Sequence, residues 1–132
     1  MEPESTPATK PISAITLFVV DLAASKRFYE AAFGHSAVFE TDDSAVFRFG
    51  GTFVNLLSVS SAPELVEPAQ VAAREAGVRA VFTITVEDVD GAAADVQAGG
   101  IELLNGPIDR PWGPRTVSFC DPDGHVWELA SS

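Results

Sequence analysis

The sequence predicts an α+β fold made of two βαβββ modules, and three observations support this prediction. The chain has 132 residues, 46% of them hydrophobic and 20% charged, which is enough apolar material for the core of one domain. It repeats itself, because ITLFVVDL at 15–22 matches FTITVEDV at 82–89 at an offset of 67 residues. Each half also ends in two β-rich runs around a turn. We therefore expect a curved, cup-like mixed sheet with helices on its outside.

The first two elements of each module are expected to be a strand and a helix. Apolar and polar residues alternate up to Asp21 and up to Asp88, and this period of two predicts strands. Apolar residues then recur at helical spacing as far as Gly34 in one half and Gly99 in the other. Asp before a helix and Gly after it are typical caps, so the pattern indicates two capped helices.

The rest of each module is expected to be β-structure. A hairpin is predicted at 45–59 around two glycines, and a second at 116–130 around the turn DPDG. Short segments at 36–40 and 100–105 supply one further strand to each module.

The predicted domain runs over 12–132, behind a disordered tail at 1–11. Module 1 covers about 12–59 and module 2 about 81–130. The linker between them, 60–80, is expected to hold a short helix within LVEPAQVAAREAG, with Pro68 in its first turn.

Charge and cysteine content exclude several classes of partner. Nineteen acids against eight bases give a net charge of −11 and repel phosphate backbones, so no nucleic-acid partner is expected. The single cysteine, Cys120, excludes an internal disulfide and indicates a reducing compartment. The N-terminal residues lack the features of a secretion signal, and no apolar run approaches the roughly 18 residues that span a bilayer. We expect a cytoplasmic protein without membrane contact.

One face of the first strand in each repeat is partly polar. Ala14, Thr16 and Phe18 lie opposite an aliphatic face in the first repeat, and Val81, Thr83 and Thr85 do so in the second. A partly polar face suits the concave side of a curved sheet that lines a ligand cavity. The alternative is simple exposure to solvent.

The order of these motifs resembles the vicinal oxygen chelate superfamily, which includes glyoxalases, extradiol dioxygenases, fosfomycin-modifying enzymes and bleomycin-resistance binding proteins. The resemblance is carried by the strand before Asp21-Leu22, the helix with Phe28-Tyr29 and Gly34, and the second copy ending in DPDGHVWEL. It covers the chain from about Ile12 to Ala130. It implies the paired-module fold but leaves the activity open, because one scaffold hosts several functions.

The resemblance also implies where metal ligands would stand. The corresponding positions hold Ala14, Asn55, Val81 and Glu128, and the first and third offer no donor atom. A catalytic zinc site generally needs three protein ligands, so we expect no metal site and no cofactor. The two histidines, His35 and His125, are expected to lie away from the cup. A metal held by rearranged acids and water is the alternative.

The segment RPWGPR at 110–115 resembles the bleomycin-resistance branch, in which this loop borders the drug-binding groove. A stiff loop makes Trp112 a stacking platform, whereas the alternative is an indole that anchors its own loop. Glu128 is expected to act as an acid/base group or hold a cationic or hydrogen-bond-donating ligand; its alternative is an internal hydrogen bond to Asn55 or Thr83. The predicted ligand-binding residues are Ala14, Thr16, Phe18, Phe53, Asn55, Leu57, Val81, Thr83, Trp112 and Glu128.

These residues favour a protein that binds or sequesters an aromatic small molecule, for example a cationic antibiotic. The alternative is an enzyme of the glyoxalase or dioxygenase kind, either metal-dependent with an unusual site or metal-free with Glu128 as its catalytic group. A third hypothesis is a structural or regulatory subunit without a ligand. The resemblance implies a homodimer, and the long connection at 60–80 would permit the two chains to exchange modules.

Overall fold

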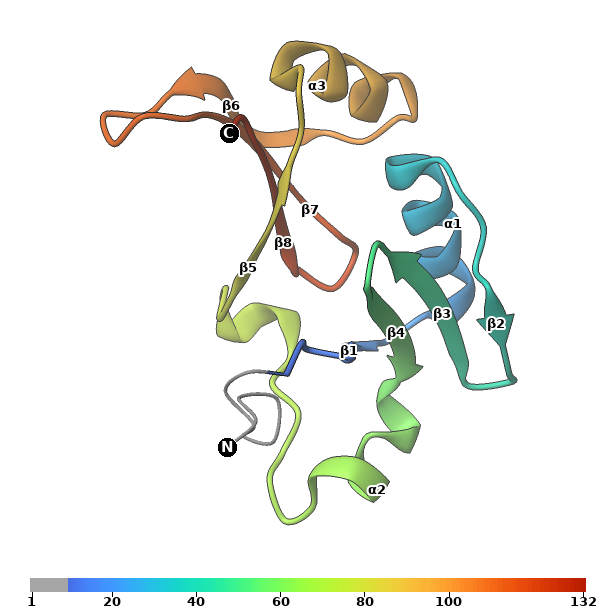
Figure 1. Cartoon of the computed structure of the whole chain (residues 1–132). Coiled ribbons are helices and arrows are strands. Elements are labelled where there is room, and N and C mark those ends of the chain that lie inside the picture. The colour runs from blue at the N-terminus through green and yellow to red at the C-terminus, as the bar shows by residue number, and fades with distance from the viewer. Residues whose placement is uncertain (1–9) are drawn as a thin grey trace, which may run out of the picture.

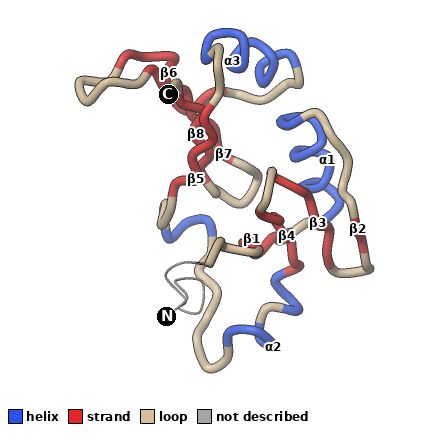
Figure 2. Tube along the Cα trace, in the orientation of Figure 1, coloured by secondary structure: helices blue, strands red, loops and turns tan. Residues whose placement is uncertain are grey.

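The strands form two four-stranded mixed sheets in the computed structural model, which describes residues 10–132 (Figures 1 and 2). Sheet A has the order β1 (Ala14–Val19), β4 (Thr52–Ser58), β3 (Ser44–Phe49) and β2 (Phe39–Glu40). Sheet B has the order β5 (Val81–Thr85), β8 (Val126–Ala130), β7 (Arg115–Cys120) and β6 (Leu103–Asp109). The predicted α+β fold with two βαβββ modules is confirmed.

The helix of each module begins and ends at capping residues that the sequence identifies. Helix α1 (Leu22–Phe33) follows Asp21, whose carboxylate accepts the backbone N–H of Ala24 at 3.1 Å. Helix α3 (Val89–Ala98) follows Asp88 in the same way. Gly34 closes α1 with a φ of 74°, a conformation that costs glycine little.

The internal repeat has a counterpart in the strand register. In sheet A, β1 runs parallel to β4 and pairs Thr16 with Asn55. In sheet B, β5 runs parallel to β8 and pairs Thr83 with Glu128. Each module therefore presents the same pair of positions at the same place, and β1 and β5 are both edge strands of their sheets.

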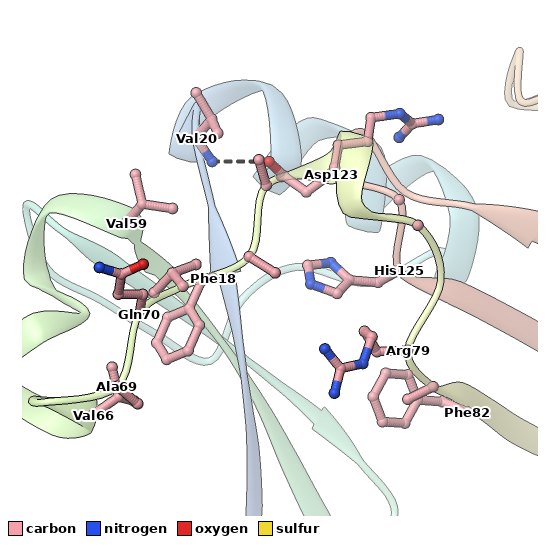
Figure 3. Close-up of a pocket in the computed structure, with 17 residues that line it drawn as sticks. Phe18, Val20, Val59, Val66, Ala69, Gln70, Arg79, Phe82, Asp123 and His125 are labelled. Carbon is pink, nitrogen blue, oxygen red and sulfur yellow. Dashed lines mark hydrogen bonds between the residues drawn. The ribbon is translucent and has the colours of Figure 1, made fainter.

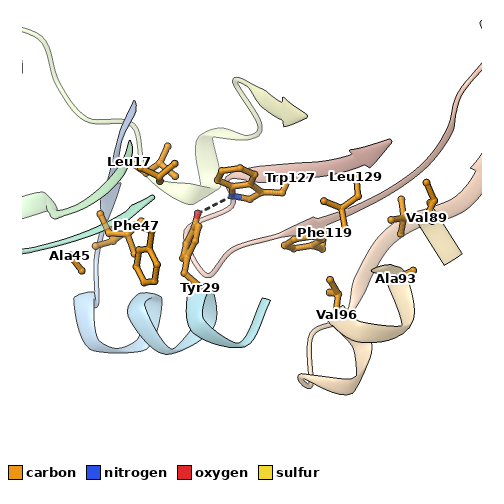
Figure 4. Close-up of a cluster of buried hydrophobic side chains, with 14 residues drawn as sticks. Leu17, Tyr29, Ala45, Phe47, Val89, Ala93, Val96, Phe119, Trp127 and Leu129 are labelled. Carbon is orange, nitrogen blue, oxygen red and sulfur yellow. Dashed lines mark hydrogen bonds between the residues drawn. The ribbon is translucent and has the colours of Figure 1, made fainter. Parts of the chain in front are cut away.

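The inner faces of both sheets pack into one hydrophobic cluster with the two helices (Figure 4). Tyr29 of α1 is fully buried and lies between the modules, with its ring centroid 5.8 Å from that of Phe47 in sheet A and 6.0 Å from that of Trp127 in sheet B. Because this shared core takes the inner face of each sheet, the opposite faces, which carry the predicted ligand-binding residues, point away from it.

The connection between the modules differs from the prediction. Its α-helix is α2 (Pro63–Val66), flanked by the short 3-10 turns η3 (Val59–Ser61) and η4 (Arg74–Ala76). The expected helix with Pro68 in its first turn is wrong: Pro63 occupies the first turn, and the helix ends before Pro68 because a proline disfavours helical geometry in the preceding residue.

The outer strand of each sheet differs in length from the prediction. The strand expected at 36–40 is the two-residue β2, and the one expected at 100–105 begins later and extends through β6. The tail expected at 1–11 falls mostly outside the described residues. Within residues 10–132, every helix is too short or too polar to cross a bilayer.

Candidate functional site

The predicted site residues of module 1 lie together on the outer face of sheet A. Along β1 and β4 the register places Ala14 beside Phe53, Thr16 beside Asn55, and Phe18 beside Leu57. Parallel neighbours in register share a face, so the six side chains form one surface. The guanidinium of Arg48 lies 4.8 Å from the centre of the Phe53 ring at its border.

The predicted residues of module 2 occupy the equivalent face of sheet B. Thr83 donates a hydrogen bond through Oγ1 to Oε1 of Glu128 at 2.8 Å. The sequence offered Asn55 or Thr83 as an internal hydrogen-bond partner for Glu128, and in the structure the partner is Thr83. Val81 is 53% exposed at the start of the edge strand. The edge-strand side of this face is therefore open in the single chain, and the Glu128 carboxylate is held in place by a neighbouring hydroxyl.

Asn55, the module 1 counterpart of Glu128, carries an unpartnered oxygen. Its Oδ1 is buried and accepts no hydrogen bond. A buried acceptor without a donor costs about 1–3 kcal/mol, so a donor supplied from outside the described chain would stabilise it. Both modules thus present an acceptor oxygen at the equivalent place.

The side chains at these positions do not fit a metal ion. Ala14 and Val81 have alkyl side chains without donor atoms, which leaves one carboxylate and one amide on two separate sheets. Within residues 10–132, no group of three or more His, Cys, Asp or Glu side chains gathers as a metal site would require.

Trp112 lies in the turn between β6 and β7 and is 70% exposed, so it does not anchor its loop by burial. The guanidinium of Arg110 lies 5.7 Å from the centre of the indole ring. Arg110 also donates through Nε to Thr116 Oγ1 at 2.9 Å. By the register of β7 and β8, Thr116 shares a face with Glu128. Arg110 therefore contacts both the exposed indole and a residue at the border of the Glu128 face.

A buried polar cluster around Asp121, which sequence reasoning missed, locks the turn before β8 to α1. The Asp121 carboxylate accepts from Tyr29 Oη and bonds His125 Nδ1, both at 2.7 Å, and Tyr29 Oη in turn accepts from Trp127 Nε1 at 2.9 Å. Burial opposes ionisation of Asp121, but hydrogen bonds from His125 and Tyr29 outweigh it and lower the pKa of the carboxyl. The only sequence signal was the Asp that opens the DPDG turn, and an Asp at this position is common in exposed turns too, so it does not indicate a buried cluster.

A cavity of about 540 Å³ lies beside the inter-module connection (Figure 3). Phe18 lines it, but the other nine predicted ligand-binding residues do not. In the single chain, the predicted residues other than Trp112 are therefore brought together on two sheet faces, and Phe18 alone among them also lines this cavity.

Comparison with known proteins shows the family to which the chain belongs. The sequence profile described as Glyoxalase/Bleomycin resistance protein/Dioxygenase superfamily matches residues 12–129. The chain belongs to this superfamily. Its specific branch is not resolved by the match.

Several known proteins resemble the chain at about a quarter sequence identity. Virulence protein STM3117 of Salmonella typhimurium is 25% identical, over 90% of this chain and 82% of that protein. Metallothiol transferase FosB of Staphylococcus saprophyticus is 25% identical, over 89% of this chain and 74% of that protein. The crystal structure of a glyoxalase/bleomycin resistance protein/dioxygenase from Nocardioides superposes with a TM-score of 0.83 at 25% identity, covering 97% of this chain and 87% of that one.

Proposed function

We propose that this superfamily member binds an organic small molecule without a metal ion. The observation that carries the proposal is the chemistry of the equivalent positions on the two sheets. Two of them hold the alkyl side chains of Ala14 and Val81, whereas the other two present the oxygens of Asn55 and Glu128. Two oxygens are fewer than the three protein ligands that a catalytic zinc site generally needs, but they can accept hydrogen bonds from an organic ligand. The surface therefore favours recognition of an organic molecule over coordination of a metal ion.

The charge and aromatic content of these faces favour an aromatic ligand with a cationic or hydrogen-bond-donating group. Glu128 offers a carboxylate that Thr83 holds in place, and Asn55 offers a buried oxygen without a donor. Trp112 is exposed at the rim, where it would stack on a flat ring at little entropic cost. Sequestration of an antibiotic of this kind is the biological role that we propose.

We further propose that the ligand site is completed by a second copy of the chain. Both ligand faces point away from the core of their own chain. Each includes the edge strand of its sheet, β1 or β5, which pairs with a neighbouring strand on one side only. The module 1 face of one copy opposite the module 2 face of its partner would enclose a ligand from both sides. The connection at 60–80, which holds only short helical turns, is long enough to permit exchange of modules.

The competing function is an enzyme, and the relatives named metallothiol transferase favour it. Such an activity in this chain would need either a metal held by a different donor set or direct acid/base chemistry by Glu128. These alternatives make different predictions about metals, and one experiment separates them.

The test is a thermal-shift panel on chelator-treated protein, with nickel, zinc and manganese on one side and metal-free bleomycin and the aromatic amine tryptamine on the other. At one hundred times its dissociation constant, a ligand should stabilise the protein by about 2.7 kcal/mol. We expect a shift with an aromatic cation in the absence of metal, reduced in Glu128→Gln and retained in the matched control Glu87→Gln, whose side chain is exposed beyond β5. A shift with a divalent metal that disappears in Glu128→Gln would favour the enzyme.

A further inference from the structure

The cavity beside the inter-module connection is a partly open pocket that shares Phe18 with the module 1 face and lies apart from the Glu128 face. Its volume of about 540 Å³ falls within the range of small-molecule sites. Its wall is largely apolar, with Phe18 of sheet A at one side and Phe82 of sheet B at another (Figure 3). Val59 of η3 and Val66 at the end of α2 add to the apolar wall, so the body of a bound molecule would lose contact with water.

Basic side chains gather at this cavity although the chain as a whole is strongly acidic. Arg74, Arg79 and His125 all line it, whereas the chain has only eight Lys and Arg residues against nineteen acids. Figure 3 shows His125 and Arg79 pointing into the same hollow from the side opposite Phe18. Three basic groups around one apolar space favour a ligand with negative charge.

Arg79 and His125 keep N–H donors available to a ligand, whereas Arg74 keeps fewer. Arg74 is partly committed, because its Nη1 donates to the carbonyl oxygens of Asp121 and Pro122. Within residues 10–132, the Arg79 guanidinium has neither an ion pair nor a hydrogen bond. The one acid in the wall, Asp123, has its two carboxylate oxygens bonded to Val20 N and Ser25 Oγ.

His125 is oriented for the same task by the buried cluster behind it. Its Nδ1 is bonded to Asp121, which leaves Nε2 as the ring nitrogen available on the cavity side. Burial alone would lower the pKa of the imidazole, but the hydrogen bond and charge of Asp121, together with the charge of Asp123, outweigh burial and raise it. The protonated ring, which donates through Nε2–H, therefore persists to higher pH than it does in a free histidine.

We propose that this cavity binds an apolar molecule carrying one carboxylate, with Arg79 and His125 pairing the carboxylate and Phe18 and Phe82 contacting the apolar body. A guanidinium bonds a carboxylate through two parallel N–H groups, and charge-assisted bonds of this kind are about twice as strong as neutral ones. This site is distinct from the Glu128 face, where the charge of the ligand is expected to be the opposite.

The test compares 4-phenylbutyrate with its uncharged amide by isothermal titration calorimetry on the full chain. We expect the carboxylate to bind saturably and about tenfold more tightly than the amide. Arg79→Gln should weaken binding of the carboxylate by about tenfold and Arg79→Lys by less, because lysine keeps the charge but loses the two-pronged geometry. Arg27→Gln, which makes the same change at an exposed position of α1, should leave binding unchanged.

Two further variants keep the test decisive. Ala69→Trp adds an indole to the cavity wall at an exposed position of the connection and should abolish binding of 4-phenylbutyrate without unfolding the chain. Glu128→Gln should leave this binding intact, so failure of the proposed function and failure of the carboxylate site are distinguishable. Equal affinity for the acid and the amide, unchanged affinity in Arg79→Gln, or no saturable binding at millimolar concentrations would overturn the proposal.

Discussion

Removal of the Tyr29 hydroxyl tests whether the buried cluster holds the two modules together. Tyr29 is fully buried, donates to Asp121 at 2.7 Å, and accepts from Trp127 Nε1 at 2.9 Å. In Tyr29→Phe the ring contacts remain, but the indole N–H loses its acceptor and Asp121 loses one of its donors. A buried group left without a partner costs about 1–3 kcal/mol, more if it is charged. Asp121 keeps His125 and two backbone N–H donors, so we expect a total loss of about 2–4 kcal/mol.

Urea unfolding followed by tryptophan fluorescence and circular dichroism at pH 6 measures this loss. For a chain of this length, each kcal/mol lowers the melting temperature by roughly 3–4 °C, so thermal unfolding gives an independent reading. The matched control is Thr41→Val, which removes a hydroxyl from an exposed network and should cost less than about 1 kcal/mol. A loss in Tyr29→Phe as small as in the control would refute the view that this cluster joins the modules.

Three other predictions concern the rim, a turn and the pH response. Trp112→Ala should weaken binding of an aromatic cation yet leave the melting temperature of the free protein nearly unchanged, since the indole is 70% exposed; collapse of the free protein would make it a packing residue. Gly106→Ala should destabilise by about 2 kcal/mol or more in urea unfolding, because a Cβ there would collide with the carbonyl oxygen of Thr116. Gly50→Ala, at a similar positive φ but in open space, should cost only about 1 kcal/mol. The pKa of His125 is raised in the folded protein, so its contribution to the free energy of unfolding is fully present below about pH 6.5 and is lost as the pH rises through the folded pKa. The difference in unfolding free energy between wild type and His125→Gln should therefore narrow from pH 6 to pH 9. A difference that stays constant over this range would contradict the prediction.

Local signals in the sequence were sufficient to predict the element order. Asp21 and Asp88 cap helices because a side-chain oxygen satisfies nearby backbone N–H groups, and this chemistry depends only on neighbours in sequence. The family resemblance gave Asn55 and Glu128 as corresponding positions, and the register pairs each of them with a threonine in the first strand of its module. The expected helix with Pro68 in its first turn was wrong because the connection lacks a clear helical periodicity to fix where a helix begins.

The cavity and the buried cluster depend on contacts that no local pattern reveals. Asp121 and Tyr29 are 92 positions apart, and only the packing of α1 against sheet B brings them together. The sequence predicted only that His125 lies away from the cup, and its role as a partner of a buried carboxylate follows from that same packing. The cavity wall combines residues of both sheets with the connection, and their convergence depends on how the modules are docked.

The proposed metal-independent binding is tested most directly by calorimetric titration of metal-free bleomycin into exhaustively chelated protein. The proposal predicts saturable binding whose dissociation constant is the same before and after chelation, and weaker binding in Glu128→Gln. Binding that vanishes on chelation and returns with added nickel, zinc or manganese would show that the aliphatic side chains of Ala14 and Val81 do not prevent this protein from using a metal.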